Sequence, residues 1–174
     1  MNTLKAEKRS MDDKAKKLRR EGFVTGNLFG REIEGSIPLK FTKKEIEVLL
    51  KNNNKGSQVM LELDGKTYDA LIKEVDYNPL AHTVEEVDFQ ALVSNEMVHS
   101  TAEIILENEE KVMSGVLQDE LKEVAYKALP ADLVDKIKVD VAGMKIGDTL
   151  RVKDLEIAKN KNIHITTDPE AVVA

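Results

Sequence analysis

Basic side chains are concentrated at the start of the 174-residue chain. Residues 1–20 hold eight Lys or Arg residues and three acidic ones, a balance of +5, although the whole chain carries −6. The basic residues are Lys5, Lys8, Arg9, Lys14, Lys16, Lys17, Arg19 and Arg20. Lysine and arginine neutralise phosphates and release counterions, and the planar arginine fork also fits phosphate oxygens or guanine edges. Residues 4–20 are therefore a candidate binding segment, although a solvated loop that only aids solubility explains the charge equally well.

The other polar residues show no pattern of a catalytic or metal site. The three histidines, His82, His99 and His164, lie far apart and lack the spacing of a metal-binding pair. The sequence has no cysteine, no glycine-rich phosphate loop and no Gly-x-Ser-x-Gly motif. The acidic runs at 85–86 and 107–110 are typical of solvated faces. We therefore predict a non-enzymatic binding protein with no metal, no other cofactor and no small-molecule substrate.

Composition and hydropathy indicate a folded protein of the cytoplasm. A hydrophobic fraction of 41% with 4% aromatics requires cores built from Val, Ile, Leu and Ala. The absence of cysteine fits a reducing compartment, and the first ten residues lack the apolar stretch of a signal peptide. No apolar run approaches the roughly 20 residues that cross a bilayer. We expect no contact with membranes.

The first half of the chain is predicted to hold six strands and a few helical turns. The strands are expected at 3–8, 23–29, 36–41, 59–63, 66–75 and 84–93. A helical turn is expected at 14–20, and a capping box starting at Thr42 predicts a helix after it. Asp64 and Gly65 predict a hairpin with a type I′ turn, and Pro38 predicts an edge strand or a bulge. Six short strands in this length favour a small β-barrel.

A boundary at 94–96 would separate this barrel from a second β-rich domain. Residues 1–93 balance to zero charge, whereas 94–174 hold 10 basic and 16 acidic residues. Strands are expected at 98–106, 120–128, 137–141 and 163–166. The predicted fold class is therefore mainly β with a few helices, in two domains at 1–93 and 94–174.

Short motifs occur along the chain in the order found in one protein family. In the first half they are LKAEKR at 4–9, LRREG at 18–22, GNLFG at 26–30, LIKEV at 71–75 and EVDFQ at 86–90. In the second half they are SGVLQ at 114–118, ALPAD at 128–132, VDVAGMKIGD at 139–148 and DL at 154–155. Each motif alone is weak, but the ordered set is specific and covers nearly the whole chain. The chain resembles bacterial large-subunit ribosomal protein twenty-five in its long, two-domain form, also called the general stress protein Ctc.

This resemblance implies an N-terminal barrel that binds 5S ribosomal RNA at its internal loop, loop E, within the large ribosomal subunit. The role of the family's C-terminal domain is less settled. Proteins recognise RNA internal loops by shape, phosphates and exposed base edges. Carried over by position and completed with the lysines of the basic segment, the expected RNA-binding set is Arg9, Lys14, Lys16, Lys17, Arg19, Arg20, Phe29, Glu86 and Asp88. The arginines would hold phosphates, and Asp88 would accept from a base or orient a neighbouring arginine.

Two positions depart from the family's pattern. The family usually has Tyr where this chain has Phe29, and His where it has Glu86. Phe29 loses a hydrogen bond worth roughly 0.5–1.5 kcal/mol, and a carboxylate about 4 Å from a phosphate is repelled by about 1 kcal/mol in water. We expect the barrel to bring Phe29 and residues 86–88 beside the basic segment. Two hypotheses follow: a 5S rRNA binder weaker than its relatives, or a divergent, stress-related paralogue that acts as a protein–protein interaction module.

Overall fold

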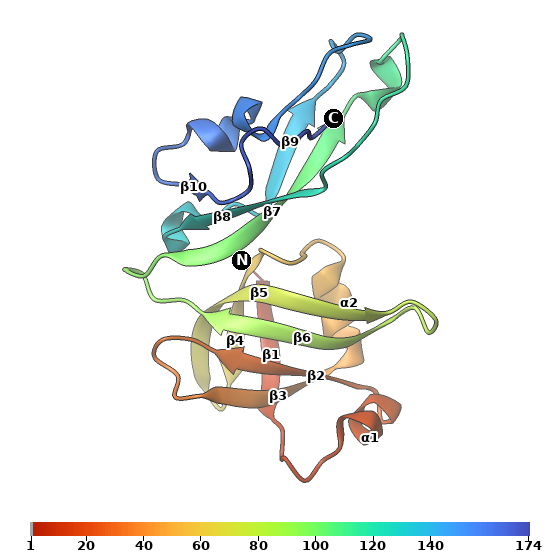
Figure 1. Cartoon of the computed structure of the whole chain (residues 1–174). Helices are drawn as coiled ribbons and strands as arrows, with labels where there is room; N and C mark the ends of the chain where they lie inside the picture. The colour runs from red at the N-terminus through yellow and green to blue at the C-terminus, as the bar shows by residue number, and fades with distance from the viewer. Residues whose placement is uncertain (1) are drawn as a thin grey trace. The chain divides into compact units, whose positions relative to one another are not determined.

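The computed structural model describes residues 2–174, which form two compact units that divide between Ser94 and Asn95 (Figure 1). The first unit is a closed barrel and the second contains a four-stranded sheet. The mainly β fold class, with a six-stranded barrel and a β-rich second part, is confirmed.

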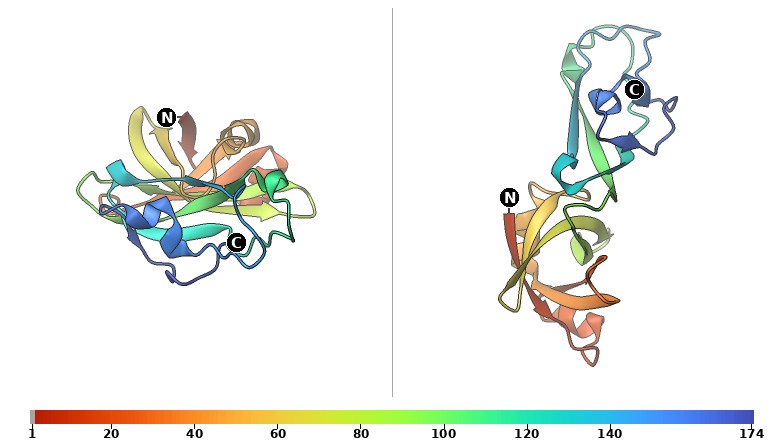
Figure 2. Two further views of the ribbon diagram at one scale, coloured as in Figure 1. Left: turned by 90° about the horizontal axis from the view of Figure 1, so that it is seen from above. Right: turned by 90° about the vertical axis from the view of Figure 1, so that its left-hand side faces the viewer.

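Six strands close the barrel in the order β1-β3-β2-β6-β5-β4. They are β1 (Asn2–Lys8), β2 (Phe23–Phe29), β3 (Ser36–Thr42), β4 (Gln58–Leu63), β5 (Lys66–Asn78) and β6 (Thr83–Ala91). The pairs β1–β4 and β2–β6 are parallel, and the others are antiparallel. Figure 2 shows the curved barrel from two further directions. The expected edge strand at Pro38 is wrong because β3 lies between β1 and β2; Pro38 donates no hydrogen bond there but accepts one from the Arg9 amide (2.9 Å).

Alternating apolar side chains fill the barrel. In β4 every second residue, Val59, Leu61 and Leu63, is buried, the pattern of a strand with one face on a core. The rings of Phe41 and Phe89 pack with centroids 5.4 Å apart. Each large apolar side chain buried in this way contributes roughly 1.5–3 kcal/mol. The packed core therefore fixes the positions of the strands, and with them the positions of the side chains on the outer face of the barrel.

Gly26 allows β2 and β6 to pair closely. A Cβ atom at Gly26 would lie only 1.9 Å from the Val87 carbonyl oxygen. Any larger residue would push the two strands apart. The parallel register that results places Thr25 opposite Glu86 and Phe29 opposite Gln90.

Two helices accompany the barrel, α1 (Ala15–Arg20) and α2 (Lys43–Leu50). The hydroxyl of Thr42 accepts from the Glu45 amide at 3.4 Å, as the predicted cap requires. The Glu45 carboxylate departs from a full capping box, since it accepts from the Thr42 hydroxyl (3.0 Å). Thr42 is also the last residue of β3, opposite Phe23 in the register with β2, so this residue joins the strand ladder to the helix.

The β4–β5 and β5–β6 hairpins fix the far strands of the barrel. Asp64 and Gly65 have φ values of 50° and 76°, as a type I′ turn requires. Strand β5 runs to Asn78, beyond the predicted end at 75, because Tyr77 and Asn78 still pair with β6. The Asn78 side chain then accepts from two amides of the turn that follows.

The second unit is built on a sheet of order β10-β8-β7-β9. Its strands are β7 (Val98–Glu107), β8 (Glu123–Ala128), β9 (Lys136–Asp140) and β10 (His164–Ile165), and its 3-10 turns are η1 (Glu109–Lys111), η2 (Pro130–Asp132), η3 (Val152–Asp154) and η4 (Glu156–Lys159). Strand β8 starts later than predicted because the amides of Glu120 and Leu121 donate to the Val173 carbonyl, outside the sheet. Buried Tyr126 donates to the Val134 carbonyl at 2.6 Å and so joins the segment between η2 and β9 to the sheet.

Candidate nucleic-acid interface

Helix α1 presents the exposed cations of the basic segment. Its six residues contain no acidic side chain, and Lys14 precedes them at the N-cap. The side chains of Lys14, Lys16, Lys17 and Arg20 are exposed. Leu18 alone is fully buried, with 3% of its surface accessible. The helix therefore faces the protein with one apolar residue and leaves four cations in solvent, although Lys17 also lies 3.9 Å from the Glu21 carboxylate.

Arg19 attaches α1 to the barrel. Its Nε donates to the Glu85 carbonyl at 3.3 Å, and its Nη2 donates to the Thr25 hydroxyl at 3.4 Å. Thr25 is buried, with 1% of its surface accessible, and its hydroxyl donates to the same Glu85 carbonyl. Arg19 was expected to hold a phosphate, but two of its guanidinium nitrogens are engaged by β2 and β6. Its main contribution in this structure is to position the helix.

Arg9 shapes the loop between β1 and α1. Its Nε and Nη2 both donate to the Asp13 carbonyl, at 3.1 and 3.0 Å. This fork closes the loop and holds the half-exposed guanidinium in place. An arginine uses two of its five N–H donors in such a contact, so the remaining donors are available to an oxygen ligand.

A carboxylate row lies on β6 beside β2. Asp88 accepts from the backbone amide of Asn27 at 3.1 Å and from its side-chain amide at 3.3 Å. Glu86 accepts from the same side-chain amide at 3.3 Å. Asp88 was expected to accept from a base or to orient an arginine. In the structure one of its oxygens is used to hold the β2 backbone.

The pKa of Glu86 shows that charges of both signs meet here. Burial raises the pKa of Glu86, and the carboxylates of Asp88 and Asp76 raise it further. The guanidinium groups of Arg19 and Arg9 lower the same pKa, which places both arginines within electrostatic range of this carboxylate. The pairing of β2 with β6 thus brings Arg19, Glu86 and Asp88 to one face.

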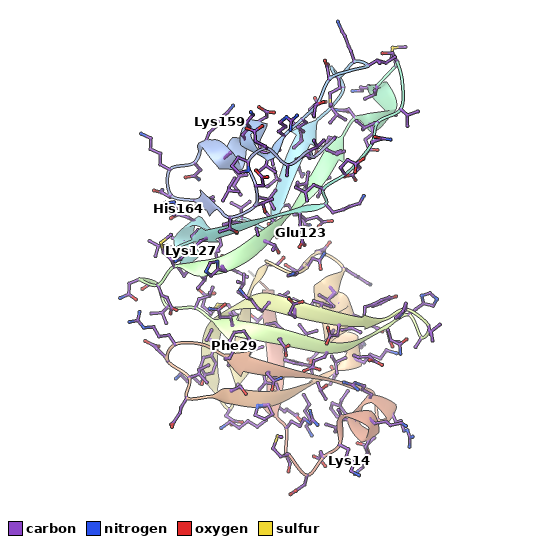
Figure 3. The ribbon with its side chains drawn as sticks, viewed as in Figure 1. Lys14, Phe29, Glu123, Lys127, Lys159 and His164 are labelled. Atoms are coloured by element: carbon purple, nitrogen blue, oxygen red, sulfur yellow. The ribbon has the colours of Figure 1, made fainter. Side chains whose placement is uncertain are left out.

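Phe29 lies away from this group. It ends β2, four residues beyond Thr25, which corresponds to about 13 Å along a strand. Figure 3 shows Phe29 at the end of β2 remote from Lys14 and α1. Alternation along β2 puts Thr25, Asn27 and Phe29 on the same outer face. In the structure residues 86–88 therefore lie beside Arg19, whereas Phe29 lies away from α1.

Sequence reasoning missed Leu18, Thr25 and Asn27 as residues that organise this face. Thr25 and Asn27 alternate with apolar residues in β2, so period-two alternation placed them on its outer face. Their partners come from β6, about 60 positions later, and only the parallel register reveals them. Among residues 2–174 no group of three or more His, Cys, Asp or Glu side chains could hold a metal ion. Within the same residues no helix is long and apolar enough to cross a membrane.

The barrel and the second sheet define a two-part, mainly β protein, and two family models match these parts. The model of the Ribosomal L25p family matches residues 4–89, and that of ribosomal protein TL5, C-terminal domain, matches residues 97–174. The chain belongs to the Ribosomal L25p family, in the form that carries the TL5-type C-terminal domain. The resemblance inferred from the ordered motifs is confirmed.

Relatives match the chain over nearly its whole length. The large ribosomal subunit protein bL25 of Carboxydothermus hydrogenoformans is 32% identical over 160 residues, which cover 91% of this chain and 79% of the relative. The protein of the same name from Bacillus velezensis is 30% identical over 178 residues, covering 100% of this chain and 87% of the relative. The bL25 protein of Thermoanaerobacter pseudethanolicus is 29% identical over 161 residues, which cover 91% of this chain and 79% of the relative.

Proposed function

We propose that this protein is a non-enzymatic component of the large ribosomal subunit in the cytoplasm and that its barrel binds 5S rRNA at loop E. The observation that carries the proposal is the attachment of α1 to β2 and β6 through Arg19. This attachment fixes the exposed lysines of α1 beside a barrel face with both donors and acceptors. The relatives' name, large ribosomal subunit protein, supports the ribosomal part of the proposal.

The roles of the site residues follow from their surroundings. The exposed cations Lys14, Lys16, Lys17 and Arg20 would neutralise phosphates. Arg9 would bind an RNA oxygen with the donors that Asp13 does not use. The remaining oxygens of Glu86 and Asp88 would accept from base amino groups in the widened groove of an internal loop. Phe29, at the end of β2, would contribute an apolar contact at the border.

A gel-shift titration with an RNA fragment containing loop E tests the proposal. The control RNA has the same length, with loop E replaced by Watson–Crick pairs. We expect tighter binding of the loop E fragment at low salt. If micromolar protein binds neither RNA, or binds both RNAs equally, the barrel does not recognise loop E.

A second candidate is favoured by the carboxylates on the same face. Asp76, Glu86 and Asp88 repel phosphates, and after burial the charges of Asp88 and Asp76 raise the pKa of Glu86. A divergent, stress-related protein–protein interaction module would use this acidic row for a basic partner. Co-sedimentation separates the two candidates, because such a module would not pellet with large ribosomal subunits at physiological salt.

A further inference from the structure

The second unit is acidic, yet several of its segments contain no acidic residue. Residues 94–174 hold 16 acidic and 10 basic side chains. Three of the acid-free segments are 97–102, 124–131 and 157–167. They contain most of β7's first half, nearly all of β8, and the end of η4 together with β10. Because β7, β8 and β10 are neighbours in the sheet, the fold gathers the strand residues of these segments at one corner of the sheet.

The strand register lines up three nitrogen-bearing side chains across this corner. Lys127 on β8 lies opposite His99 on β7 and opposite His164 on β10. Neighbouring strands are about 4.8 Å apart, so the row spans about 10 Å. His99 and His164 are exposed and Lys127 is half-exposed. Figure 3 shows Lys127 and His164 at the same end of their strands.

Lys161 adds a cation close to this row, because it precedes His164 by three residues, at most about 10 Å along the chain. Lys159 ends η4 and Lys161 follows it, and both side chains are exposed. Among the described residues, no carboxylate lies within 4.0 Å of Lys127, Lys159 or Lys161, whereas Lys122, Lys138 and Lys153 of the same unit form ion pairs. These lysines are therefore not engaged in an ion pair with a described residue and can bind an external anion.

We propose that this basic corner, defined as His99, Lys127, Lys161 and His164, binds the phosphate backbone of RNA. Ammonium groups and protonated imidazoles donate to phosphate oxygens and release counterions when they bind. The corner lies on the second unit, so it constitutes an RNA contact additional to the proposed loop E site. Its side chains include no aromatic ring apart from imidazole, which favours backbone contact over base stacking.

The carboxylates on β7 and β8 lie too far along the strands to cancel the row of His99, Lys127 and His164. Glu103 and Glu123 lie on the same strands, four residues from His99 and Lys127, which corresponds to about 13 Å. The Debye length at physiological ionic strength is about 8 Å. Asp132, Glu156 and Asp168 border the acid-free segments in sequence. A chain of phosphates can follow the row, whereas an acidic peptide would also need an apolar anchor to bind with comparable strength.

The chain's three histidines provide a local assay. Because only His82, His99 and His164 occur, their imidazole signals can be resolved by NMR in the full-length protein. The probe is an RNA duplex of uniform Watson–Crick pairs, titrated at low salt. We expect the signals of His99 and His164 to shift with RNA concentration. His82, on the turn between β5 and β6 of the barrel, serves as the internal reference.

A pair of charge-matched variants completes the test. Lys127→Gln with Lys161→Gln should reduce the imidazole shifts and lower the salt dependence of duplex binding by about two units of slope. The control, Lys111→Gln with Lys145→Gln, removes two charges from the same unit outside the corner and should leave both unchanged. Equal effects of the two variants, or unmoved His99 and His164 signals, would overturn the proposal. If polyglutamate at the same concentration of charges shifts the His99 and His164 signals as much as RNA does, the corner binds acidic proteins and the proposal is wrong.

Discussion

The substitution Glu86→Gln tests whether one carboxylate limits RNA binding by the barrel. Glutamine keeps the side-chain oxygen that accepts from Asn27 at 3.3 Å but removes the negative charge. It also relieves the repulsion by Asp88 and Asp76 that raises the pKa of Glu86. The packing of β6 should therefore be retained, so that a change in the affinity for RNA can be attributed to the lost negative charge of Glu86.

Coulomb's law gives the expected size of the effect. A carboxylate about 4 Å from a phosphate is repelled by about 1 kcal/mol in water, and by more where the interface excludes water. Removal of this repulsion should tighten loop E binding by about fivefold or more. The gain should shrink as salt is added, because exposed charges are screened.

The assay is a titration of the loop E fragment at two salt concentrations. Glu62→Gln is the matched control, since Glu62 is a half-exposed carboxylate on β4 of the same barrel, away from β2 and β6. Unchanged or weaker binding by Glu86→Gln would refute the argument that Glu86 opposes phosphates. An equal gain from Glu62→Gln would show that net charge matters rather than position.

The raised pKa of Glu86 also predicts a pH dependence of stability. The folded carboxyl keeps its proton at a pH where the unfolded chain has lost it. Its contribution to stability is therefore fully present below the unfolded pKa, near the ordinary value of 4.5, and is lost as the pH rises through the higher folded pKa. In urea denaturation, Glu86→Gln should gain stability relative to wild type as the pH is raised to neutrality. A constant difference at all pH values would contradict this.

Three further changes have definite expected outcomes. Arg20→Gln should lower the salt slope of loop E binding by about one unit without changing the melting temperature. Arg19→Lys keeps the positive charge but loses the guanidinium that binds Glu85 and Thr25, so it should lower the affinity at an unchanged salt slope. A changed slope for Arg19→Lys with an unchanged slope for Arg20→Gln would contradict these roles of the two arginines. Gly26→Ala should cost about 3 kcal/mol or more in urea denaturation, because its Cβ would lie 1.9 Å from a β6 carbonyl oxygen; a smaller cost would mean that the strands separate easily. Tyr126→Phe leaves both backbone groups of Val134 without their partner and should cost about 1–3 kcal/mol, with loop E binding unaffected; a neutral change would show that water replaces the hydroxyl.

Much of the barrel could be predicted from local patterns in the sequence. Alternating apolar residues located all six strands, and Asp64-Gly65 specified its hairpin because a type I′ turn needs positive φ at both positions. The ends of strands were less accurate. Strand β5 continues to Asn78 through irregular pairing with β6, and no local signal marks such an extension.

The organisation of the site depended on contacts that local patterns do not encode. Arg19 reaches Glu85 across 66 positions, and Asp88 reaches Asn27 across 61. Charge alone made Arg19 look like a free phosphate ligand. Its attachment to the barrel follows only from the parallel β2–β6 register, which Gly26 permits. The separation of Phe29 from α1 could not be predicted either, because the distance along β2 becomes relevant only once the location of α1 is known.

The two carboxylates of β6 are therefore not equivalent for RNA binding. Asp88 accepts a backbone hydrogen bond from Asn27, so its charge also stabilises the β2–β6 pair. Glu86 accepts only from a side-chain amide, and Arg9 and Arg19 act on its pKa without an ion pair among the described contacts. An incoming phosphate would compete with Glu86 for Arg9 but would leave the bond of Asp88 intact. Position 86 should thus set the affinity for RNA, while position 88 maintains the strand geometry on which that affinity depends.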